Sequence, residues 1–432
     1  MYILYSLGLA LALLISLPWW MLQVLRLGKY RAGLRERLGL VPSRLAPPNS
    51  AGSVWIHAVS VGEVLAVSHL AGELQKANAG MQVYISTTTA TAQRLARERF
   101  GEAHVFFMPL DFGVAVQAYL RAVRPRMLIL AETEFWPNLL HLAKRQGASV
   151  AIVNARISDR SFPRYRRFRW FFSRILADVD LFLTQTETDA QRLREIGAAA
   201  ERVHVSGNLK FDVRVASGSG LADDLRRNCR QDQDRYVMVC GSTAEGEEEV
   251  LLEAFRQVLR QFPSATMILA PRHPERFERV AGLVAASGFT LVRRSKWAGR
   301  GQLSGAVFLL DSVGELAALY AIADVAFVGG SLLPDVGGHN ILEPAQHGVP
   351  ILVGPNTYNF REIVRLFERG GAVITVTTGN LGGVLLQLLE DTGERHRLGQ
   401  RARELFVENT GATARTLTAL EPLLREPATR VL

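Results

Sequence analysis

The chain has 432 residues, 48% of them apolar, and its 50 Lys and Arg residues outnumber 41 Asp and Glu residues. This length exceeds what one ordinary hydrophobic core supports, and the composition excludes a disordered chain, so we expect two globular domains. The two cysteines, Cys229 and Cys240, exclude a disulfide framework and have no metal-ligand spacing, which favours a reducing compartment.

The chain opens with a segment that carries no charged side chain from Met1 to Leu25. A transmembrane helix needs about 20 apolar residues, so we predict a membrane anchor helix over residues 1–25. The Trp19-Trp20 pair resembles an interfacial belt, and the cationic residues after it place the body of the protein on the cytoplasmic side. These cationic residues are Arg26, Lys29, Arg31, Arg35 and Arg37.

Two alternatives to a spanning anchor are open. A cleaved signal peptide is disfavoured, because no basic region precedes the apolar stretch. Pro18 leaves room for a helix that lies in the membrane interface and does not cross it completely.

Beyond this segment, short β-branched runs alternate with helical patterns, which is typical of parallel sheets covered by helices on both faces. The first seven strands are predicted at SVWIHAVS, MQVYIST, VFFMPL, RMLILAE, SVAIVNA, DLFLTQ and VHVSG. After a polar stretch the pattern restarts with YVMVCGS, ATMILAPR, TLVRR, AVFLLD, DVAFVGG, VPILVGP and AVITVT. We therefore expect an N-terminal domain over 26–212, a linker over 213–233, a C-terminal domain over 234–408 and a closing helix over 409–432.

The stretch RISDRSFPRYRRFRWFFSR, residues 156–174, interleaves arginines with aromatic residues. Such a mixture suits a nucleic-acid groove or a membrane interface with anionic head groups. An ordinary amphipathic helix with an arginine-rich solvent face is a third reading. The preceding apolar segment favours the membrane, and no recognition module accompanies the basic residues to support nucleic-acid binding.

Two doubly wound domains in tandem imply a cleft, and ligands of open parallel sheets bind beyond the carboxyl ends of the strands. Glu63 follows the first strand by a Ser-Val-Gly turn, which predicts that it lies in the first turn of the next helix. It is either an acid matched to the helix dipole or a general base, because apolar neighbours raise the proton affinity of a carboxylate.

Three more candidates follow strands of the first domain. Glu132 and Glu134 lie in AETEFWPNLL, where a helix is expected to start at Pro137 and where one acid could serve only as a cap or an ion-pair partner. Lys210 in GNLKFD is either a solvated lysine or a point charge that neutralises an anionic ligand.

The second domain supplies candidates for anion binding. Arg272 and His273 come directly after a strand and before a helix that begins with proline, where they could hold a phosphate. Val313, Gly314 and Glu315 form a similar strand-to-helix turn.

The stretch VGGSLLPDVGGHNILEPAQHGVPILVGP joins a strand, a glycine-rich loop and a helix expected to start near Asn340. Asn340 and Glu343 have the spacing of a capping box. A glycine-rich loop before a helix also accepts phosphate, and a carboxylate one turn later binds ribose hydroxyls. The loop matches neither the dinucleotide fingerprint nor the P-loop.

Eight motifs occur in order behind the N-terminal segment: HAVSVGE, ETEFWPN, NARISDRSFPRY, GNLKFD, GSTAEGEE, PRHPERF, GGSLLPDVGGHNILEPA and GPNTYNF. Over nearly the whole chain this series resembles 3-deoxy-D-manno-oct-2-ulosonic acid (Kdo) transferases of lipid A biosynthesis. The resemblance implies the GT-B glycosyltransferase fold, in which two Rossmann-like domains face a central cleft, with the acceptor on the N-terminal domain and the nucleotide on the C-terminal one. It also implies transfer of Kdo from CMP-Kdo to a lipid A precursor at the cytoplasmic face of the inner membrane, with inversion of the anomeric configuration.

The resemblance assigns roles to the candidate residues. It implies that Glu63 is the general base and that Glu132 and Lys210 stabilise the transition state. The residues that it implies contact CMP are Arg272, His273, Val313, Gly314, Glu315, Asn340, Ile341, Leu342 and Glu343.

We expect no metal and no other cofactor. The Asp-x-Asp sequences at 178–180 and 232–234 precede strands, whereas a metal-nucleotide site would follow one, so we interpret both as solvated turns. Two rival functions are a UDP-sugar epimerase or UDP-hexosamine transferase and a membrane-tethered nucleotide-binding scaffold without catalytic activity.

Overall fold

The computed structural model describes residues 1–27, 33–49, 52–78, 80–212, 220–229 and 235–425. The chain divides into two compact units. The first comprises Met1–Val213 and Thr410–Leu432, and the second comprises Arg214–Asn409.

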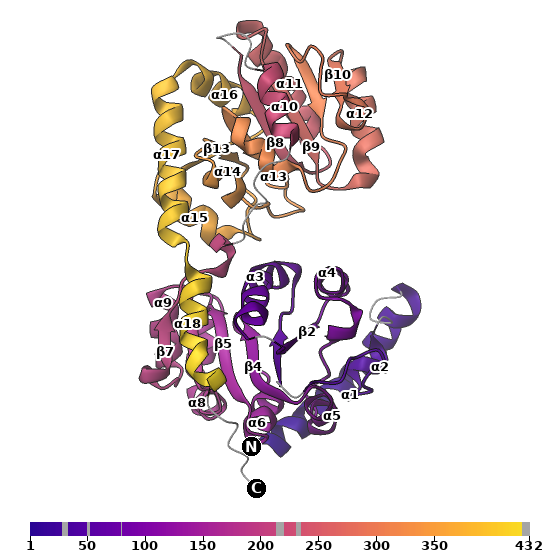
Figure 1. Cartoon of the computed structure of the whole chain (residues 1–432), viewed down its shortest axis with the longest axis vertical. Helices are drawn as coiled ribbons and strands as arrows, with labels where there is room; N and C mark the ends of the chain where they lie inside the picture. Colours follow the sequence, from indigo (N-terminus) through magenta and orange to yellow (C-terminus); the bar gives the residue numbers. More distant parts are fainter. Residues whose placement is uncertain (28–32, 50–51, 79, 213–219, 230–234, 426–432) are drawn as a thin grey trace. The chain divides into compact units, whose positions relative to one another are not determined.

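The first unit is built on a seven-stranded sheet in the order β3-β2-β1-β4-β5-β6-β7, with every neighbouring pair parallel (Figure 1). The strands are β1 Ser53–His57, β2 Gln82–Thr87, β3 Val105–Phe107, β4 Pro125–Ala131, β5 Ser149–Ala155, β6 Leu181–Thr184 and β7 Val203–Val205.

Both faces of this sheet are buried, because a hydrophobic core lies on each of them and alternate residues of a strand point into opposite cores. Trp55 contributes to one hydrophobic core, in which it meets Phe106 edge-on at 5.2 Å, whereas Val54 and Ile56 belong to the core on the other face. A strand with apolar residues on both faces reads as a continuous apolar run, which is why the pattern predicted these strands.

Helices alternate with the strands, and several of them cover the two faces of the sheet. The helices that precede the second unit are α1 Tyr2–Leu27, α2 Leu34–Arg37, α3 Val61–Ala77, α4 Ala90–Phe100, α5 Gly113–Val123, α6 Pro137–Arg145, α7 Phe162–Arg167, α8 Arg169–Leu176 and α9 Glu187–Glu195, with short 3-10 turns η1 Glu102–His104, η2 Ala200–Arg202 and η3 Leu209–Asp212.

The last helix, α18 Ala412–Arg425, belongs to the first unit although it follows the second in sequence. Its Leu420 and Leu424 belong to the same hydrophobic core as Val54 and Ile56. Its start is fixed by Asp212, whose carboxylate accepts hydrogen bonds from the Gly411 and Thr413 N–H groups. The sequence predicted a helix here but gave no sign that it returns to the first sheet.

The second unit contains another parallel sheet, in the order β10-β11-β9-β8-β12-β13-β14. Its strands are β8 Val237–Thr243, β9 Thr266–Pro271, β10 Thr290–Arg293, β11 Ala306–Leu309, β12 Val325–Val328, β13 Ile351–Val353 and β14 Val373–Thr375. Its helices are α10 Gly220–Cys229, α11 Glu247–Gln261, α12 Phe277–Ala286, α13 Leu316–Leu319, α14 Leu342–Gln346, α15 Arg361–Arg369, α16 Leu381–Glu390 and α17 Thr392–Asn409, with 3-10 turns η4 Pro274–Arg276, η5 Arg294–Lys296 and η6 Tyr320–Ile322.

Each of the fourteen predicted apolar runs overlaps one strand, so the prediction of two parallel α/β sheets is confirmed. The stretch predicted as a linker, 213–233, contains a helix in its middle part. Residues 220–229 form α10, whose Leu221 and Leu225 are buried in the core of the second unit. The rest of that linker, 213–219 and 230–233, lies outside the described residues.

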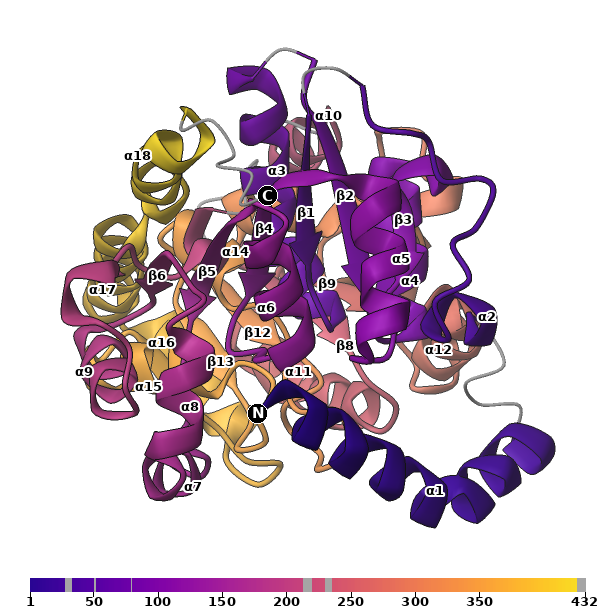
Figure 2. The ribbon, with the colours of Figure 1, turned by 90° about the horizontal axis from the view of Figure 1, so that it is seen from below.

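The N-terminal segment forms α1, which starts against the first unit and runs outward from α6 (Figure 2). The Tyr2 ring stacks on His141 of α6 at 3.9 Å, and its hydroxyl donates to Asp178 at 2.6 Å. The prediction of a transmembrane anchor is not supported, since no helix in the described part of the chain has both the length and the apolar character required to cross a bilayer. The side chains of Trp19, Trp20 and Arg26, and all of Lys29 and Arg31, lie outside the described residues.

The interpretation of 178–180 as a solvated turn is also wrong. Asp178 accepts hydrogen bonds from Tyr2 and from the His141 ring. Asp180 accepts from Lys144 and, at 2.9 Å, from the Val150 N–H group. The second Asp-x-Asp sequence, 232–234, lies outside the described residues.

Candidate active site

Glu63 lies in the first turn of α3, at the carboxyl edge of the first sheet, as predicted. Ser60 caps this helix, because its hydroxyl oxygen accepts a hydrogen bond from the Glu63 N–H group at 3.3 Å. In return the Glu63 carboxylate accepts from the Ser60 hydroxyl and from the Val59 N–H group, both at 2.8 Å. This reciprocal capping fixes the orientation of the carboxylate, so the structural reading of Glu63 as a helix-start acid also holds.

The environment of Glu63 favours its protonated form. The residue is only 8% exposed. Burial is the largest influence and, with the charge of Glu132 and a smaller effect of Glu134, raises the pKa of the carboxyl from 4.5 to about 7, although the bonds from Val59 and Ser60 oppose this. A carboxylate with a pKa near neutrality is suited to general-base catalysis at physiological pH.

Glu132 and Lys210 meet beside this carboxylate. Glu132 follows β4 with a left-handed backbone, at φ 57°, and its N–H group donates to the Val153 carbonyl at 2.9 Å. The Lys210 ammonium lies 3.5 Å from Glu132 Oε1, and both side chains remain about a quarter exposed, at 22% and 26%. A left-handed conformation costs about 1–3 kcal/mol outside glycine and is typical of functional positions.

Glu134 is the third acid of this cluster. Burial and the nearby charge of Glu132 raise the pKa of its carboxyl. The structure therefore brings together the three predicted acids and the predicted lysine of the first domain.

Three amides that the sequence analysis missed position the Lys210 turn. Asn154 is buried, adopts φ 55°, and accepts a hydrogen bond from the Leu209 N–H group at 3.0 Å. The Gln185 amide donates to the Asn154 carbonyl, and Asn208 both donates to Gln185 and accepts from the Lys210 N–H group, all at 3.0 Å. These residues lie at or just after strands. The criterion that selected Glu63, a polar residue that follows a predicted strand, could therefore have found them as well.

In the second unit, Arg272 and His273 lie just beyond β9, beside His339 of the glycine-rich loop. Burial, followed by the positive charges of Arg272 and His273, lowers the pKa of the His339 imidazole to about 4. His339 Nε2 is buried without a hydrogen-bond partner in the described part of the chain. His339 was missed by the sequence analysis, although it lies within the motif GGHN.

Asn340 and Glu343 complete this group in a form that differs from a standard capping box. The Asn340 amide donates to the Glu343 carboxylate at 3.3 Å, and its oxygen accepts from the Leu342 N–H group at 3.1 Å. Burial raises the pKa of the Glu343 carboxyl, while Asn340 and the charge of Arg272 oppose the shift. The side chains of Ile341 and Leu342 are buried, so only their backbone atoms are placed to contact a ligand.

The start of the glycine-rich loop does not have the free N–H groups that a phosphate requires. The N–H groups of Gly330, Ser331 and Leu332 all donate to the carboxylate of Glu247. The helix after the loop begins at Leu342 and has five residues. The expectation that this glycine-rich loop binds phosphate is therefore wrong for the N–H groups of Gly330, Ser331 and Leu332, which already donate to Glu247.

The turn at Val313, Gly314 and Glu315 follows β11 at the same edge of the sheet. Val313 is 78% exposed, and the Glu315 carboxylate pairs with Arg294 at 3.0 Å. In the part of the chain that the structure describes, no hydrogen bond or ion pair joins this turn to Arg272 or Glu343. A hydrogen bond thus joins Asn340 to Glu343, and the charge of Arg272 acts on both Glu343 and His339, but no described contact joins the turn to these residues.

Residues 32–213 match the family model of 3-deoxy-D-manno-octulosonic-acid transferase (kdotransferase), and residues 223–405 match that of glycosyl transferases group 1. The chain is 35% identical over 402 residues to a 3-deoxy-D-manno-octulosonic acid transferase of Haemophilus influenzae, covering 92% of each chain. It is also 35% identical to the transferase of that name from Bordetella pertussis, covering 92% of this chain and 93% of the relative.

Among solved structures, a putative UDP-N-acetylglucosamine 2-epimerase from Listeria monocytogenes aligns with a TM-score of 0.55 and 14% identity, covering 90% of this chain and 99% of the other. This likeness concerns the fold alone. Together with the two parallel sheets, the match to glycosyl transferases group 1 confirms the predicted GT-B-like fold.

The raised pKa of Glu63 predicts how stability changes with pH. The folded state holds this proton more tightly than the unfolded state does. The contribution of the protonated Glu63 to the free energy of unfolding is therefore complete below about pH 4.5 and is lost as the pH rises through about 7. In urea titrations from pH 4.5 to 8, the free energy of unfolding of the parent should therefore fall relative to Glu63→Gln by about 3 kcal/mol. Glu73→Gln, at a partly exposed acid of the same helix, is the control. If the difference in unfolding free energy between the parent and Glu63→Gln stays constant with pH, the burial of a protonated acid is contradicted.

Proposed function

Because the chain belongs to the 3-deoxy-D-manno-octulosonic-acid (Kdo) transferase family and is a glycosyltransferase, we propose that it transfers Kdo from CMP-Kdo to a hydroxyl of lipid IVA. In this proposal the reaction inverts the anomeric configuration and Glu63 is the general base. The observation that carries the proposal is a buried, oriented carboxylate whose pKa of about 7 lies near physiological pH.

A single displacement accounts for the reaction. Glu63 accepts the proton of a glucosamine hydroxyl as that oxygen attacks the anomeric carbon of Kdo, whose ring develops oxocarbenium character. The bond from this carbon to the CMP phosphate oxygen breaks, and CMP leaves with the electron pair. One base is sufficient, because the leaving phosphate is a stable anion.

Cationic groups of the chain fit the anionic donor. Arg272 and His273, beside His339, are proposed to bind the CMP phosphate, where negative charge grows as the bond breaks. Asn340 and Glu343 are suited to bind ribose hydroxyls, and Ile341, Leu342 and the 313–315 turn to contact CMP through the backbone. We propose no metal and no other cofactor, and we assign Lys210 and Glu132 to stabilisation of the transition state.

The function is tested with purified protein, CMP-Kdo and tetraacylated lipid A precursor in detergent, with mass spectrometry counting the sugars added. Glu63→Gln should lower kcat by about 10²–10⁴-fold, because the amide cannot accept the proton. Glu73→Gln on the same helix should remain as active as the parent. Full activity of Glu63→Gln would exclude Glu63 as the base, and a thermal shift with UDP but none with CMP would favour the UDP-sugar alternative.

We also propose that α1 attaches the protein to the cytoplasmic face of the inner membrane by lying in the plane of the bilayer. Most of the exposed apolar residues of this helix recur at helical spacing along one side and form a stripe, whereas Leu17, which is 49% exposed, lies off it. The residues of the stripe are Ile3, Leu4, Leu7, Leu11, Leu14, Ile15 and Leu22, each at least 44% exposed. Such a stripe with few charges suits insertion among lipid head groups and the upper acyl chains.

The contacts at the start of α1 support the in-plane orientation. A helix that crosses the membrane ahead of a cytoplasmic body must place Met1 on the opposite side. In the structure, however, the first turns of α1 are bound to the body, through Tyr2 to Asp178 and through Ser6, which accepts from Asn138 at 3.0 Å. Crossing would break these contacts.

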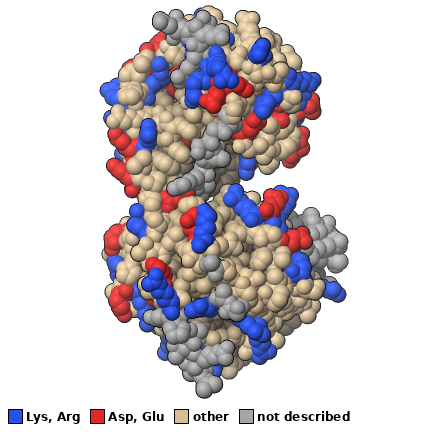
Figure 3. Space-filling model, viewed as in Figure 1, with Lys and Arg blue, Asp and Glu red and all other residues tan. Residues whose placement is uncertain are grey.

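The stretch of arginines and aromatic residues at 156–174 lies near this end of α1. Asp178, which accepts the hydrogen bond from Tyr2, comes just after α8, and α8 contains the end of that stretch. Tyr165, Phe171 and Phe172 pack against the core, as in an ordinary amphipathic helix, but Phe168 and Trp170 are 44% and 63% exposed. Exposed arginines flank these two residues in the sequence and suit anionic head groups. They are Arg164, Arg166, Arg167 and Arg169. On the face drawn in Figure 3, by contrast, cationic and anionic side chains are intermixed over both units.

The orientation of α1 is tested by attaching a cysteine tag ahead of Met1 in a Cys229→Ser background and treating spheroplasts with a membrane-impermeant maleimide. An in-plane helix keeps the tag inside the cell, so it should react only after permeabilisation. Ala285→Cys, at an exposed position of α12, is the control for an internal cysteine. Labelling of the tag in intact spheroplasts, without labelling of the control, would show that the helix crosses the membrane and would contradict the proposal.

A further inference from the structure

Two consecutive glutamates, Glu247 and Glu248, are buried at the start of α11 in the motif GSTAEGEE. Glu247 is 0% exposed and Glu248 is 1% exposed. Adjacent buried acids are costly to desolvate unless each is fully hydrogen-bonded, so their partners show what they hold in place.

Glu247 binds the beginning of the glycine-rich loop. Its Oε2 accepts hydrogen bonds from the N–H groups of Ala244 at 2.8 Å and Gly330 at 2.7 Å. Its Oε1 accepts from the N–H groups of Ser331 at 3.0 Å and Leu332 at 2.8 Å. This carboxylate therefore occupies the position that an anionic ligand would take in a glycine-rich cradle, and it fixes the loop that leads to His339 and Asn340.

The backbone around Glu247 leaves no spare room. A methyl group added at Gly329 would lie 2.8 Å from Glu247 Oε2 and 2.7 Å from the Ser242 carbonyl oxygen. Gly329 is therefore required for the loop to approach the carboxylate closely enough to donate these bonds.

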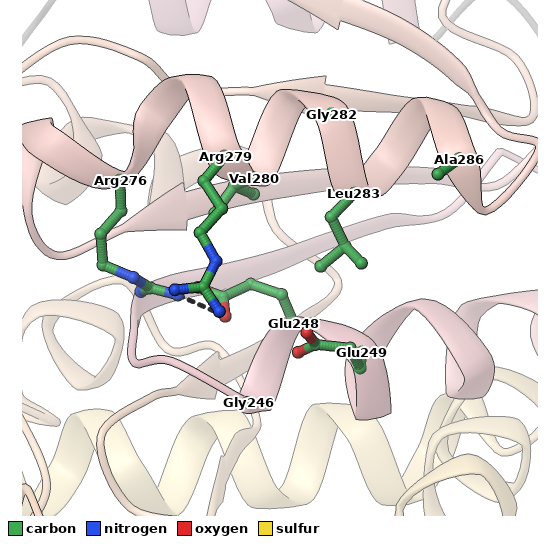
Figure 4. A pocket seen from close by; sticks show the side chains of 9 residues that line it. All are labelled: Gly246, Glu248, Glu249, Arg276, Arg279, Val280, Gly282, Leu283 and Ala286. Carbon is green, nitrogen blue, oxygen red and sulfur yellow. Dashed lines mark hydrogen bonds and ion pairs between the residues drawn. The ribbon is translucent and has the colours of Figure 1, made fainter.

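Glu248 binds the turn after β9, which carries Arg272 and His273 of the proposed donor site. Its Oε2 lies 2.8 Å from Arg276 Nη2, and its Oε1 accepts a hydrogen bond from the Thr243 hydroxyl at 2.7 Å. Arg276 also donates to the Thr243 carbonyl at 3.1 Å, an oxygen to which the Arg272 N–H group donates as well, at the same distance. Figure 4 shows Arg276 extending from its turn to meet Glu248 of α11.

From these contacts we infer that Glu247 and Glu248 are positioning residues for donor binding, each holding one of the two loops that carry the cationic and ribose-binding groups. Glu247 fixes the loop that leads to His339, Asn340 and Glu343, and Glu248 fixes the turn of Arg272 and His273 through Arg276. This inference rests on the proposed donor site, but neither acid needs to contact the donor itself.

Glutamine cannot reproduce the interactions of either carboxylate in full. Because both oxygens of Glu247 accept two N–H bonds, the NH2 group of a glutamine would face two N–H donors whichever way the amide is turned. At position 248, a glutamine could keep both partners only if its oxygen faced Arg276 and the Thr243 hydroxyl turned to accept from its NH2 group, and it would still remove the charge that pairs with Arg276.

The test compares Glu247→Gln and Glu248→Gln with Glu249→Gln, a change at the exposed acid of the same first turn. Calorimetry with CMP should show binding weakened about tenfold or more in the first two variants and unchanged in the third. In the transfer assay, the KM for CMP-Kdo should rise while the KM for the lipid acceptor stays constant, a split that a general loss of stability would not produce.

Hydrogen exchange identifies the loop that each acid controls. Glu247→Gln should speed amide exchange at 330–332 but not at 272–276, and Glu248→Gln should have the reverse effect. If Glu247→Gln or Glu248→Gln does not fold, Thr243→Val provides a milder variant that removes one bond to Glu248 and should weaken CMP binding in the same direction.

The outcomes separate this inference from the proposed function. If the parent binds CMP and the folded glutamine variants bind it as tightly as Glu249→Gln does, the positioning role is wrong. If the parent does not bind CMP, the proposed donor is wrong. Loop-specific exchange in that case would still support the structural part of the inference.

Discussion

The protonation of Glu63 is set by opposing influences, of which burial is the largest. Burial and the charges of Glu132 and Glu134 favour the neutral acid, whereas hydrogen bonds from Val59 and Ser60 favour the carboxylate. The result is a group that exchanges a proton near pH 7 and whose oxygens point in a fixed direction. Without the capping bonds the acid would remain protonated at neutral pH, and without burial it would be too weak a base to take a proton from an alcohol.

The two units use buried acids in contrasting ways at the same edge of their sheets. Glu63 has other acids as neighbours and only two hydrogen-bond donors, so its charge is poorly compensated. Glu247 has four N–H donors, and Glu248 has an arginine and a hydroxyl. The first arrangement suits the proton transfer proposed for Glu63, and the second fixes the loops whose side chains are proposed to bind the donor.

Much of the fold could be predicted because buried parallel strands are continuous apolar runs that local sequence reveals. The position of Glu63 in the first turn of α3 followed from the same local rule, since the turn after a buried strand is short. The spacing of Asn340 and Glu343 also predicted a contact between them, which the structure confirms in a modified form.

Features that depend on distant parts of the chain were not accessible in this way. Glu247 accepts a hydrogen bond from a loop 83 residues further along the chain. Neither segment alone indicates that the N–H groups of this loop donate to a carboxylate. The return of α18 to the first unit and the docking of Tyr2 on Asp178 are likewise contacts between distant segments. The docking of α1 could not be predicted for the same reason, because an apolar run indicates a candidate anchor but not the protein surface that holds its first turn.

The account is tested most directly by measuring the pKa of Glu63 itself. Infrared difference spectra between the parent and Glu63→Gln, recorded across a pH titration, isolate the carboxyl stretch of this one residue. The structure predicts a midpoint near pH 7. It also predicts that Glu132→Gln lowers this midpoint, because a neighbouring negative charge is removed. A midpoint near 4.5 in the parent, unchanged by Glu132→Gln, would contradict the role assigned to Glu63.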